Sequence, residues 1–258
     1  MKKIKIIALV LAVVTCLSLV SCKRRAGEAS RGLEMTLSES GTYYIVTGIG
    51  SCDDYDVLLP ETHKGLPVAA IGERAFNGTE ITRITLTENV LFIADNAFES
   101  CPKIAYNELG GLYYFGTEKN PAYALIKASK DSKTTVTIHK DTKILADSSL
   151  YDLEITALVL PLGITHIGKN ALYSCSELES ITLPNGLCYI GAEAFGNCGK
   201  LTEINLPINV SYIGDSAFMY CAKLAKINFA GTEKQWNAME KAPRWDNYFD
   251  DYEVTFGR

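Results

Sequence analysis

The stretch LESITLPNGLCYIGAEAFGNCGKLTEINLPINVSYIGDSAFMYC, residues 178–221, contains the same motif twice, 23 residues apart. In each copy an isoleucine-glycine pair is followed four residues later by a small-aromatic pair, as in Ile190-Gly191 with Ala194-Phe195. Repetition at a short fixed period is typical of stacked coils, in which each repeat packs only against its neighbours. The motif therefore predicts a solenoid and disfavours a globular enzyme core.

Six copies of this motif occur along the chain. Successive copies start 22, 52, 22, 23 and 23 residues apart, so one insertion of about 30 residues interrupts a regular period. The copies are Ile71-Gly72 with Ala75-Phe76, Ile93-Ala94 with Ala97-Phe98, Leu145-Ala146 with Ser149-Leu150, Ile167-Gly168 with Ala171-Leu172, Ile190-Gly191 with Ala194-Phe195, and Ile213-Gly214 with Ala217-Phe218.

Each repeat also contains a short apolar pattern before its isoleucine-glycine pair. In one repeat Leu201, Ile204 and Leu206 are followed by Pro207, and the alternation of the last two leucine-like positions predicts a short strand that the proline ends. We expect the glycine of the motif to adopt an unusual backbone dihedral. The segment that follows it, Asp215–Phe218 in this repeat, suits a single helical turn.

One coil cannot fold alone. Its apolar side chains contribute about 1.5–3 kcal/mol each, whereas ordering its backbone costs about 1–2 kcal/mol per residue. Stacking must supply the difference, and the ends of the stack need caps. We expect an N-terminal cap at 41–66 with a strand pair, Tyr43–Gly48 and Val57–Leu59. We expect a C-terminal cap at 230–258, with a capping box at Thr232–Gln235 and an edge strand ending at Phe256.

The unit L-x-x-I-x-L-P-x-x-V-x-x-I-G-x-x-A-F-x-x-C resembles the leucine-rich repeat of the bacterial surface protein A (BspA) type, over residues 41–258. The resemblance implies a leucine-rich-repeat-like solenoid, mainly β, with stacked parallel short strands, single helical turns, one hairpin insertion at about 105–135 and a short C-terminal capping helix. Gly41–Pro60 looks like the family's opening segment, and Gly231-Thr232 with Gln235-Trp236 looks like its closing motif. Departures are Leu145-Ala146 for Ile-Gly, and Thr79 and Leu153 at the cysteine position.

The N-terminus has the pattern of an export signal. Three lysines precede an apolar run at 6–20, which is too short to span a bilayer comfortably, so residues 1–21 are predicted to be a signal peptide. Leu19–Cys22 resembles the lipobox of bacterial lipoproteins, which implies that Cys22 becomes a lipidated N-terminus and anchors the chain to a membrane. Ordinary secretion is the alternative. Residues 22–40 are rich in polar groups and are predicted to form a flexible tether.

The charge of the chain disfavours nucleic acid as a partner. Residues 1–21 contain three of the 25 basic groups and none of the 30 acidic groups, so their removal leaves 22 basic groups against 30 acidic groups, a net charge of −8. Because the repeats continue through almost all of the remaining chain, we expect one elongated domain at 41–258.

Six cysteines follow Cys22, and an even number in an exported chain allows fifteen disulfide pairings. Cys175, Cys198 and Cys221 recur at the repeat period, however, which places them in a column with a spacing of about 4.8 Å. That spacing exceeds the usual Cβ separation in a disulfide. We therefore expect buried free thiols, whereas a bond between Cys52 and Cys188, which lie off the column, stays open. No C-x-x-C pair exists, and a zinc site has little support.

Other motifs fit the repeat better than they fit catalysis. Residues 163–170 nearly spell a Walker A loop, but asparagine replaces the serine or threonine that binds magnesium, and equivalent repeats lack the lysine. The three histidines, His63, His139 and His166, belong to no metalloprotease or hydrolase motif. Acidic runs at 53–56 and 250–253 lack the spacing of a calcium loop and are expected to be solvated edges. We expect no catalytic residue, no metal and no cofactor.

Two surfaces are candidates for binding a partner. The outward strand positions form polar columns that we expect on the concave face, and the candidate residues there are Arg83, Thr182, Glu203, Asn205, Lys226 and Asn228. The insertion carries a cluster of aromatic residues around a turn at 116–121, and the candidates are Tyr113, Tyr114, Phe115 and Tyr123. These rings either stack on sugars or enter a protein groove, or they pack back on the solenoid.

The sequence therefore indicates a non-catalytic, lipid-anchored protein of the cell envelope, exposed at the surface. The family resemblance implies a binding surface for a host or bacterial surface protein or a glycan, as in adhesion. The alternative is a scaffold or assembly factor within the envelope, without host contact. A third hypothesis is a hydrolase whose site is assembled from scattered residues.

Overall fold

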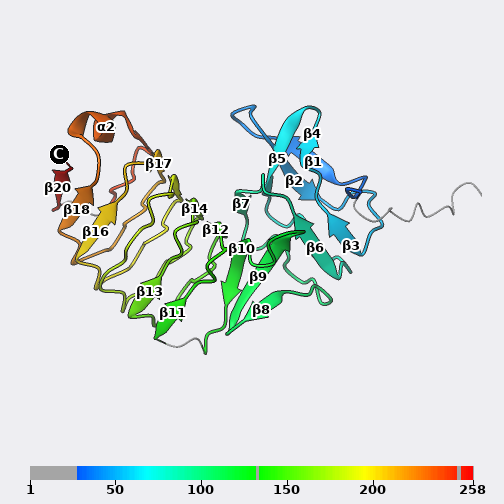
Figure 1. The fold of residues 1–258 in the computed structure, drawn as a ribbon, viewed down its shortest axis with the longest axis horizontal. Coiled ribbons are helices and arrows are strands. Elements are labelled where there is room, and N and C mark those ends of the chain that lie inside the picture. The colour runs from blue at the N-terminus through cyan, green and yellow to red at the C-terminus, as the bar shows by residue number, and fades with distance from the viewer. Residues whose placement is uncertain (1–27, 132–133, 249–250, 258) are drawn as a thin grey trace, which may run out of the picture.

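The computed structural model describes residues 28–131, 134–248 and 251–257. The predicted signal peptide and Cys22 lie outside these residues. The described chain forms stacked coils that follow an arc, with the two ends of the chain at opposite ends of the stack (Figure 1). Within the described residues no helix is long and apolar enough to cross a bilayer.

Successive coils contribute short parallel strands to two rows, each of which is divided among separate hydrogen-bonded sheets. We call them the outer and inner ladders, because β11, β13 and β16 follow the outer rim of the arc and β12, β14 and β17 follow its inner side (Figure 1). The outer ladder comprises β3 (Asp56–Leu58), β6 (Arg83–Leu86), β11 (Thr135–Thr137), β13 (Ala157–Val159), β16 (Glu203–Leu206), β18 (Lys226–Phe229) and β20 (Glu253–Phe256). The inner ladder comprises β5 (Leu66–Ile71), β7 (Phe92–Ile93), β12 (Ile144–Leu145), β14 (His166–Ile167), β15 (Tyr189–Ile190), β17 (Tyr212–Ile213) and β19 (Glu240–Lys241).

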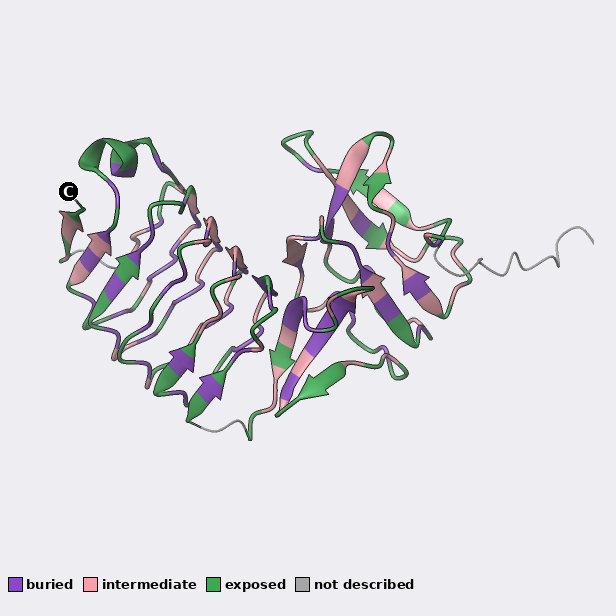
Figure 2. Ribbon diagram, viewed as in Figure 1, coloured by how far each residue is buried: buried purple, intermediate pink, exposed green. Residues whose placement is uncertain are grey.

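The repeats are in register, as the sequence predicts. Ile167 pairs with Ile190, and Ile190 pairs with Ile213, and all three side chains are 0% exposed. Along the strands of the outer ladder, buried positions alternate with exposed ones, as in β16 (Figure 2). The aromatic residues of the motif stack between coils, with 5.5 Å between the ring centroids of Phe195 and Phe218. The stacked coils of the solenoid are therefore confirmed, whereas the core divides into two clusters, both of which include residues of the insertion.

The insertion forms part of the stack, because its strands pair with both ladders. It forms an antiparallel sheet of β8 (Asn107–Leu109), β9 (Leu112–Thr117) and β10 (Ala124–Ala128). β9 pairs in parallel with β6 of the outer ladder, whereas β10 pairs in parallel with β12 of the inner ladder. The insertion thus crosses from one ladder to the other and joins the N-terminal coils to the C-terminal coils.

The turn around each motif differs from the expected helical turn. In one coil two successive turns flank Phe195, with hydrogen bonds from Ala194 N to Gly191 O at 3.3 Å and from Cys198 N to Phe195 O at 3.3 Å. Glu193 and Asn197 have left-handed φ angles of 54° and 57°, and their N–H groups donate to the next coil. The left-handed residues therefore let one coil pair with the next, which a helical turn does not allow.

The motif glycine also has a different role from the expected one. Gly191 does not have a positive φ angle, so its backbone conformation is one that other residues also adopt. A Cβ atom at Gly191 would lie 2.6 Å from backbone atoms of Gly168 and Lys169. Glycine is required because neighbouring coils approach each other too closely for a side chain.

Among the described residues, the cysteines of the column are buried free thiols, as expected, and Cys52 and Cys188 are also unbonded. Each thiol of the column donates a hydrogen bond to a carbonyl of the preceding coil, as from Cys198 Sγ to Leu172 O at 3.3 Å. Burial raises the pKa of Cys175 to about 12, so this thiol stays protonated. The column serves packing, because cysteine combines a small apolar side chain with a weak donor.

The N-terminal cap differs from the predicted strand pair. β2 (Tyr44–Gly48) pairs with β1 (Glu34–Leu37) and with β5, whereas β3 pairs with β6. The two segments separate because the apolar residues of β2 continue the inner ladder and those of β3 continue the outer ladder. β4 (Thr62–His63) adds a short antiparallel edge to β5. β1 lies in the region predicted to be tether, so the folded domain begins earlier than the sequence indicated.

The C-terminal cap follows the prediction. Helix α2 (Glu233–Ala238) starts at Thr232, which forms a reciprocal capping box with Gln235. Trp236 and Met239 are both 8% exposed and cover the end of the core. β20 completes the outer ladder beside β18.

Candidate ligand-binding face

An aromatic row lies along the inner side of the arc. In the two-residue strands β7, β14, β15 and β17, the second residue points into the core and the first lies on the inner face. These first residues are half-buried and have planar rings, and we call them the aromatic row: Phe92, His166, Tyr189 and Tyr212.

The rings of the row contact one another continuously. Tyr189 and Tyr212 stack with centroids 4.8 Å apart and an interplanar angle of 6°, and His166 stacks on the other side of Tyr189 at 5.7 Å. Phe92 meets Tyr189 edge-on at 5.0 Å and His166 at 5.3 Å. Both faces of Tyr189 are therefore covered, and an edge of its ring meets Phe92.

The row connects parts of the chain that the insertion separates. Phe92 belongs to the coils before the insertion, whereas His166, Tyr189 and Tyr212 belong to those after it. Tyr43, which precedes β2, continues the row with its ring centroid 6.2 Å from that of Phe92. The inner face is therefore a single surface to which the N-terminal cap and the C-terminal coils both contribute.

Three titratable groups at this face have shifted pKa values. Burial lowers the pKa of His166 to about 4, so the imidazole is neutral at neutral pH. Burial, together with the negative charges of Asp95 and Glu73, raises the pKa of Asp147 to about 6. The hydrogen bond that Asp147 accepts from Lys169 N–H opposes this shift. Burial also raises the pKa of Tyr189 to about 12. At neutral pH the row is uncharged and Asp147 lies beside it as an anion.

These shifts predict opposite pH dependences. The unfolded chain binds more protons at His166 between pH 6.5 and 4, so this group removes stability on acidification. The folded chain binds more protons at Asp147 between pH 6 and 3.8, so that group adds stability. The Asp147→Asn variant lacks the group that adds stability on acidification. Between pH 7 and 4.5 we expect its free energy of unfolding to fall by about 1–2 kcal/mol relative to that of the wild-type chain. The effect stays this small because both groups are partly exposed.

Urea denaturation at the two pH values measures this difference. The matched variant, His166→Phe, keeps a ring in the row but lacks the group that removes stability on acidification. Its free energy of unfolding should therefore rise over the same interval relative to that of the wild-type chain. Identical pH dependences for both variants and the wild-type chain would contradict the assignment of these shifts.

The candidate aromatic residues of the insertion pack back on the solenoid. Tyr114, Phe115 and Tyr123 are 0%, 2% and 5% exposed. The Tyr123 hydroxyl donates to Glu88 O at 2.8 Å, and Tyr114 Oη accepts from His139 N at 3.2 Å. Tyr113 is half-buried, with Lys127 Nζ 5.4 Å from its ring centroid. Of the two alternatives, rings that contact a ligand and rings that pack back on the solenoid, the structure shows the second.

The polar columns lie on the outer ladder, so the expectation that they form the concave face is wrong. The reason is that the strands that carry these columns follow the outer rim of the arc, where β11, β13 and β16 lie (Figure 1). Several candidates there contact their neighbours. Arg83 forms an ion pair with Asp56, and Thr182 forms a backbone β-bridge with Asn205. Asn228 Nδ2 donates to Asn205 Oδ1 at 3.0 Å and to Glu203 Oε2 at 3.5 Å. Lys226 pairs in register with Glu203 and Glu253.

The motifs that resembled catalytic sites are parts of coils. The lysine of the Walker-like segment, Lys169, donates its backbone N–H to Asp147 Oδ1 at 2.8 Å, as part of a turn. His63 packs against Tyr44, whereas His166 lies in the aromatic row. Across residues 28–131, 134–248 and 251–257, no three His, Cys, Asp or Glu side chains gather so as to hold a metal ion.

The sequence contained a signal for the aromatic row. Aligning the repeats on their inward isoleucine or leucine places Ala70, Phe92, Ile144, His166, Tyr189 and Tyr212 in one column. Four of the six residues in that column have rings, whereas Ala70 and Ile144 are buried. It was missed because the two-residue inner strands are too short to produce an alternating pattern, whereas the longer outer strands do so clearly.

The comparisons with known proteins agree with this architecture. Six copies of the family described as BspA type leucine rich repeat region match residues 59–116 and 128–239. Among curated proteins nothing matches significantly. A leucine rich cell surface protein from Faecalibacterium prausnitzii is similar in structure, with 21% identity and a TM-score of 0.46, over 71% of this chain and 62% of that one.

Two further solved structures are similar. A leucine rich repeat protein of T. pallidum has 20% identity and a TM-score of 0.35, over 89% of this chain and 98% of that one. The pneumococcal vaccine antigen PcpA has 19% identity and a TM-score of 0.49, over 79% of this chain and 57% of that one. The chain spans less than two thirds of the F. prausnitzii protein.

Proposed function

This chain belongs to the BspA-type leucine-rich repeat family, and from that premise we propose that it is a non-catalytic binding protein of the bacterial cell surface. Its ligand site is the aromatic row on the inner face. The export signal and the lipobox-like Leu19–Cys22 support anchoring through a lipid on Cys22. Both features lie outside the described residues.

The observation that carries the proposal is the half-buried, mutually stacked aromatic row on the inner side of an arc. Half-buried tyrosine rings that neighbouring rings hold in place supply contact area at little entropic cost, and such residues are enriched in protein interfaces. A sugar ring needs a free aromatic face. Because His166 and Tyr212 cover both faces of Tyr189, the geometry favours a protein partner.

Binding of the soluble chain to arrays of extracellular proteins and glycans tests the proposal. We expect protein ligands, and we expect Phe92→Ala and Tyr212→Ala each to weaken their binding by tenfold or more, about 1.4 kcal/mol or above. The matched control is Tyr151→Ala. Tyr151 stacks on Tyr173 at 5.5 Å and 6°, so it loses the same kind of ring contact away from the row.

Two results would contradict the proposal. Equal weakening by Tyr151→Ala would show that the variants act through stability, and glycan-only binding would reject the protein partner. Protease treatment of intact cells separates the adhesion hypothesis from the scaffold alternative, because only a surface-exposed chain is removed.

A further inference from the structure

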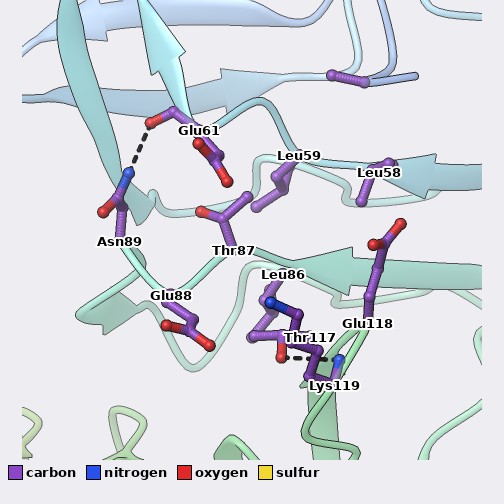
Figure 3. A pocket seen from close by; sticks show the side chains of 11 residues that line it. Leu58, Leu59, Glu61, Leu86, Thr87, Glu88, Asn89, Thr117, Glu118 and Lys119 are labelled. Atoms are coloured by element: carbon purple, nitrogen blue, oxygen red, sulfur yellow. Dashed lines mark hydrogen bonds between the residues drawn. The ribbon is translucent and has the colours of Figure 1, made fainter. Parts of the chain in front are cut away.

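A cleft opens at the N-terminal end of the solenoid, where the β9–β10 turn of the insertion faces the first coils. Its volume is about 460 Å³. Apolar side chains of Leu58, Leu59 and Leu86 lie on one side of it, and polar residues surround them (Figure 3).

Three glutamates from three separate connections line this cleft. Glu61 follows β3, Glu88 lies between β6 and β7, and Glu118 lies between β9 and β10. Lys119 is the one basic side chain among the described residues that line it, so the cleft carries an excess of negative charge. Within the described chain none of the three carboxylates forms an ion pair. No metal-holding group of carboxylates is present in that same part of the chain.

A buried polar atom in the same cleft also lacks a partner. Thr87 lies between Glu61 and Glu88 (Figure 3) and is 9% exposed, and its Oγ1 has no hydrogen-bond partner among the described residues. Buried hydroxyl groups are nearly always hydrogen-bonded, so the oxygen of this one can accept from a donor that lies outside the described residues. An ammonium or guanidinium group is such a donor.

The chain itself brings basic residues to this place. Ser30 is fixed beside the cleft, because its N–H donates to Leu58 O at 2.8 Å and its Oγ accepts from Leu58 N at 3.0 Å. Ala29 lines the cleft. Arg25 precedes Ala29 by four residues, and an extended chain of four residues spans up to about 14 Å.

We propose that Lys23, Arg24 and Arg25, which lie outside the described residues, bind in this cleft. Their cationic groups pair with the glutamates, one N–H donates to Thr87 Oγ1, and an aliphatic stem covers Leu58, the one half-buried leucine of the cleft. Exposed ion pairs are individually weak. Here the short connection to Ala29 makes the local concentration of the basic segment high, so several weak pairs suffice. The contact fixes the side of the cap from which the chain leaves toward Cys22.

Trypsin cleavage after Lys23, Arg24 and Arg25 tests the proposal in the chain from residue 22 onward, which includes every described residue. We expect cleavage in the triple variant Glu61→Gln, Glu88→Gln, Glu118→Gln to be roughly fivefold faster than in the wild-type chain. The matched control is Glu154→Gln, Glu179→Gln, Glu233→Gln, which removes the same charge at exposed positions away from the cleft and should cleave at the wild-type rate. Far-UV circular dichroism shows whether each variant is folded.

Zero-length carbodiimide coupling supplies a second measurement, because it joins an amine to a carboxylate only when the two are in contact. Mass spectrometry should find Lys23 joined to Glu61, Glu88 or Glu118. Equal cleavage rates in all three chains, or coupling of Lys23 mainly to carboxylates outside the cleft, would overturn the proposal.

Discussion

Replacing Gly214 with alanine is expected to lower the free energy of unfolding by about 3 kcal/mol. The new Cβ would lie 2.4 Å from Ala192 N and 2.6 Å from Gly191 C. Both atoms belong to the backbone of the preceding coil, so no side-chain rotation relieves the contact. The two coils must separate instead. Urea denaturation measures the loss, and hydrogen exchange at Gly214 N–H, which donates to Ile190 O at 2.8 Å, should accelerate first.

Gly199→Ala is the matched control for this prediction. A Cβ at Gly199 meets nothing within 4 Å, and Gly199 is not among the positive-φ glycines of the described chain. Alanine there should leave stability unchanged or raise it by about 0.4–1 kcal/mol, because it restricts the unfolded chain. Similar effects of the two substitutions would mean that the motif glycine does not serve close approach of the coils.

The contrast between these glycines shows what the sequence could and could not predict about the fold. The period of 23 residues and the inward isoleucines predict stacked coils, because any other arrangement would leave the apolar columns exposed. The reason for the glycine was not accessible in the same way. A dihedral constraint and a close backbone approach both select glycine, and only the distance between coils distinguishes them.

The N-terminal cap was predicted less well, for a related reason. Caps do not repeat, so no alignment between coils indicates which segments pair. Sequence proximity suggested that residues 43–48 pair with 57–59, whereas β2 and β3 join different ladders. The solenoid ahead of them, rather than their own sequences, determines their partners.

The candidate site was predicted least well. The sequence predicts the polar columns and the aromatic insertion as binding surfaces. In the structure, however, Phe115 and Tyr123 are buried and the columns follow the outer rim. Which strand of a coil faces the inner side depends on the curvature of the whole stack, and no single repeat specifies that curvature. Aligned repeats show a column of rings, but only the structure shows that Phe92 and Tyr189, 97 positions apart in the sequence, are in contact.

The largest loss of stability is expected at the aromatic position of the motif. Phe195 is 0% exposed and its ring stacks on that of Phe218 at 5.5 Å and 11°. Phe195→Ala should therefore lower the free energy of unfolding by about 3–5 kcal/mol, because it removes buried apolar area and leaves a cavity between two coils. Urea denaturation followed by circular dichroism measures the loss.

The repeat itself supplies the control for Phe195. Leu150 and Leu172 occupy the equivalent position in other coils and are both 0% exposed. Phe195→Leu should therefore cost only about 1–2 kcal/mol, from reduced volume and the lost ring contact. Because each coil packs only against its neighbours, faster hydrogen exchange should be confined to the coils that flank Phe195. Uniform acceleration along the chain, or equal losses for alanine and leucine, would show that the ring acts on the whole fold rather than on one coil contact.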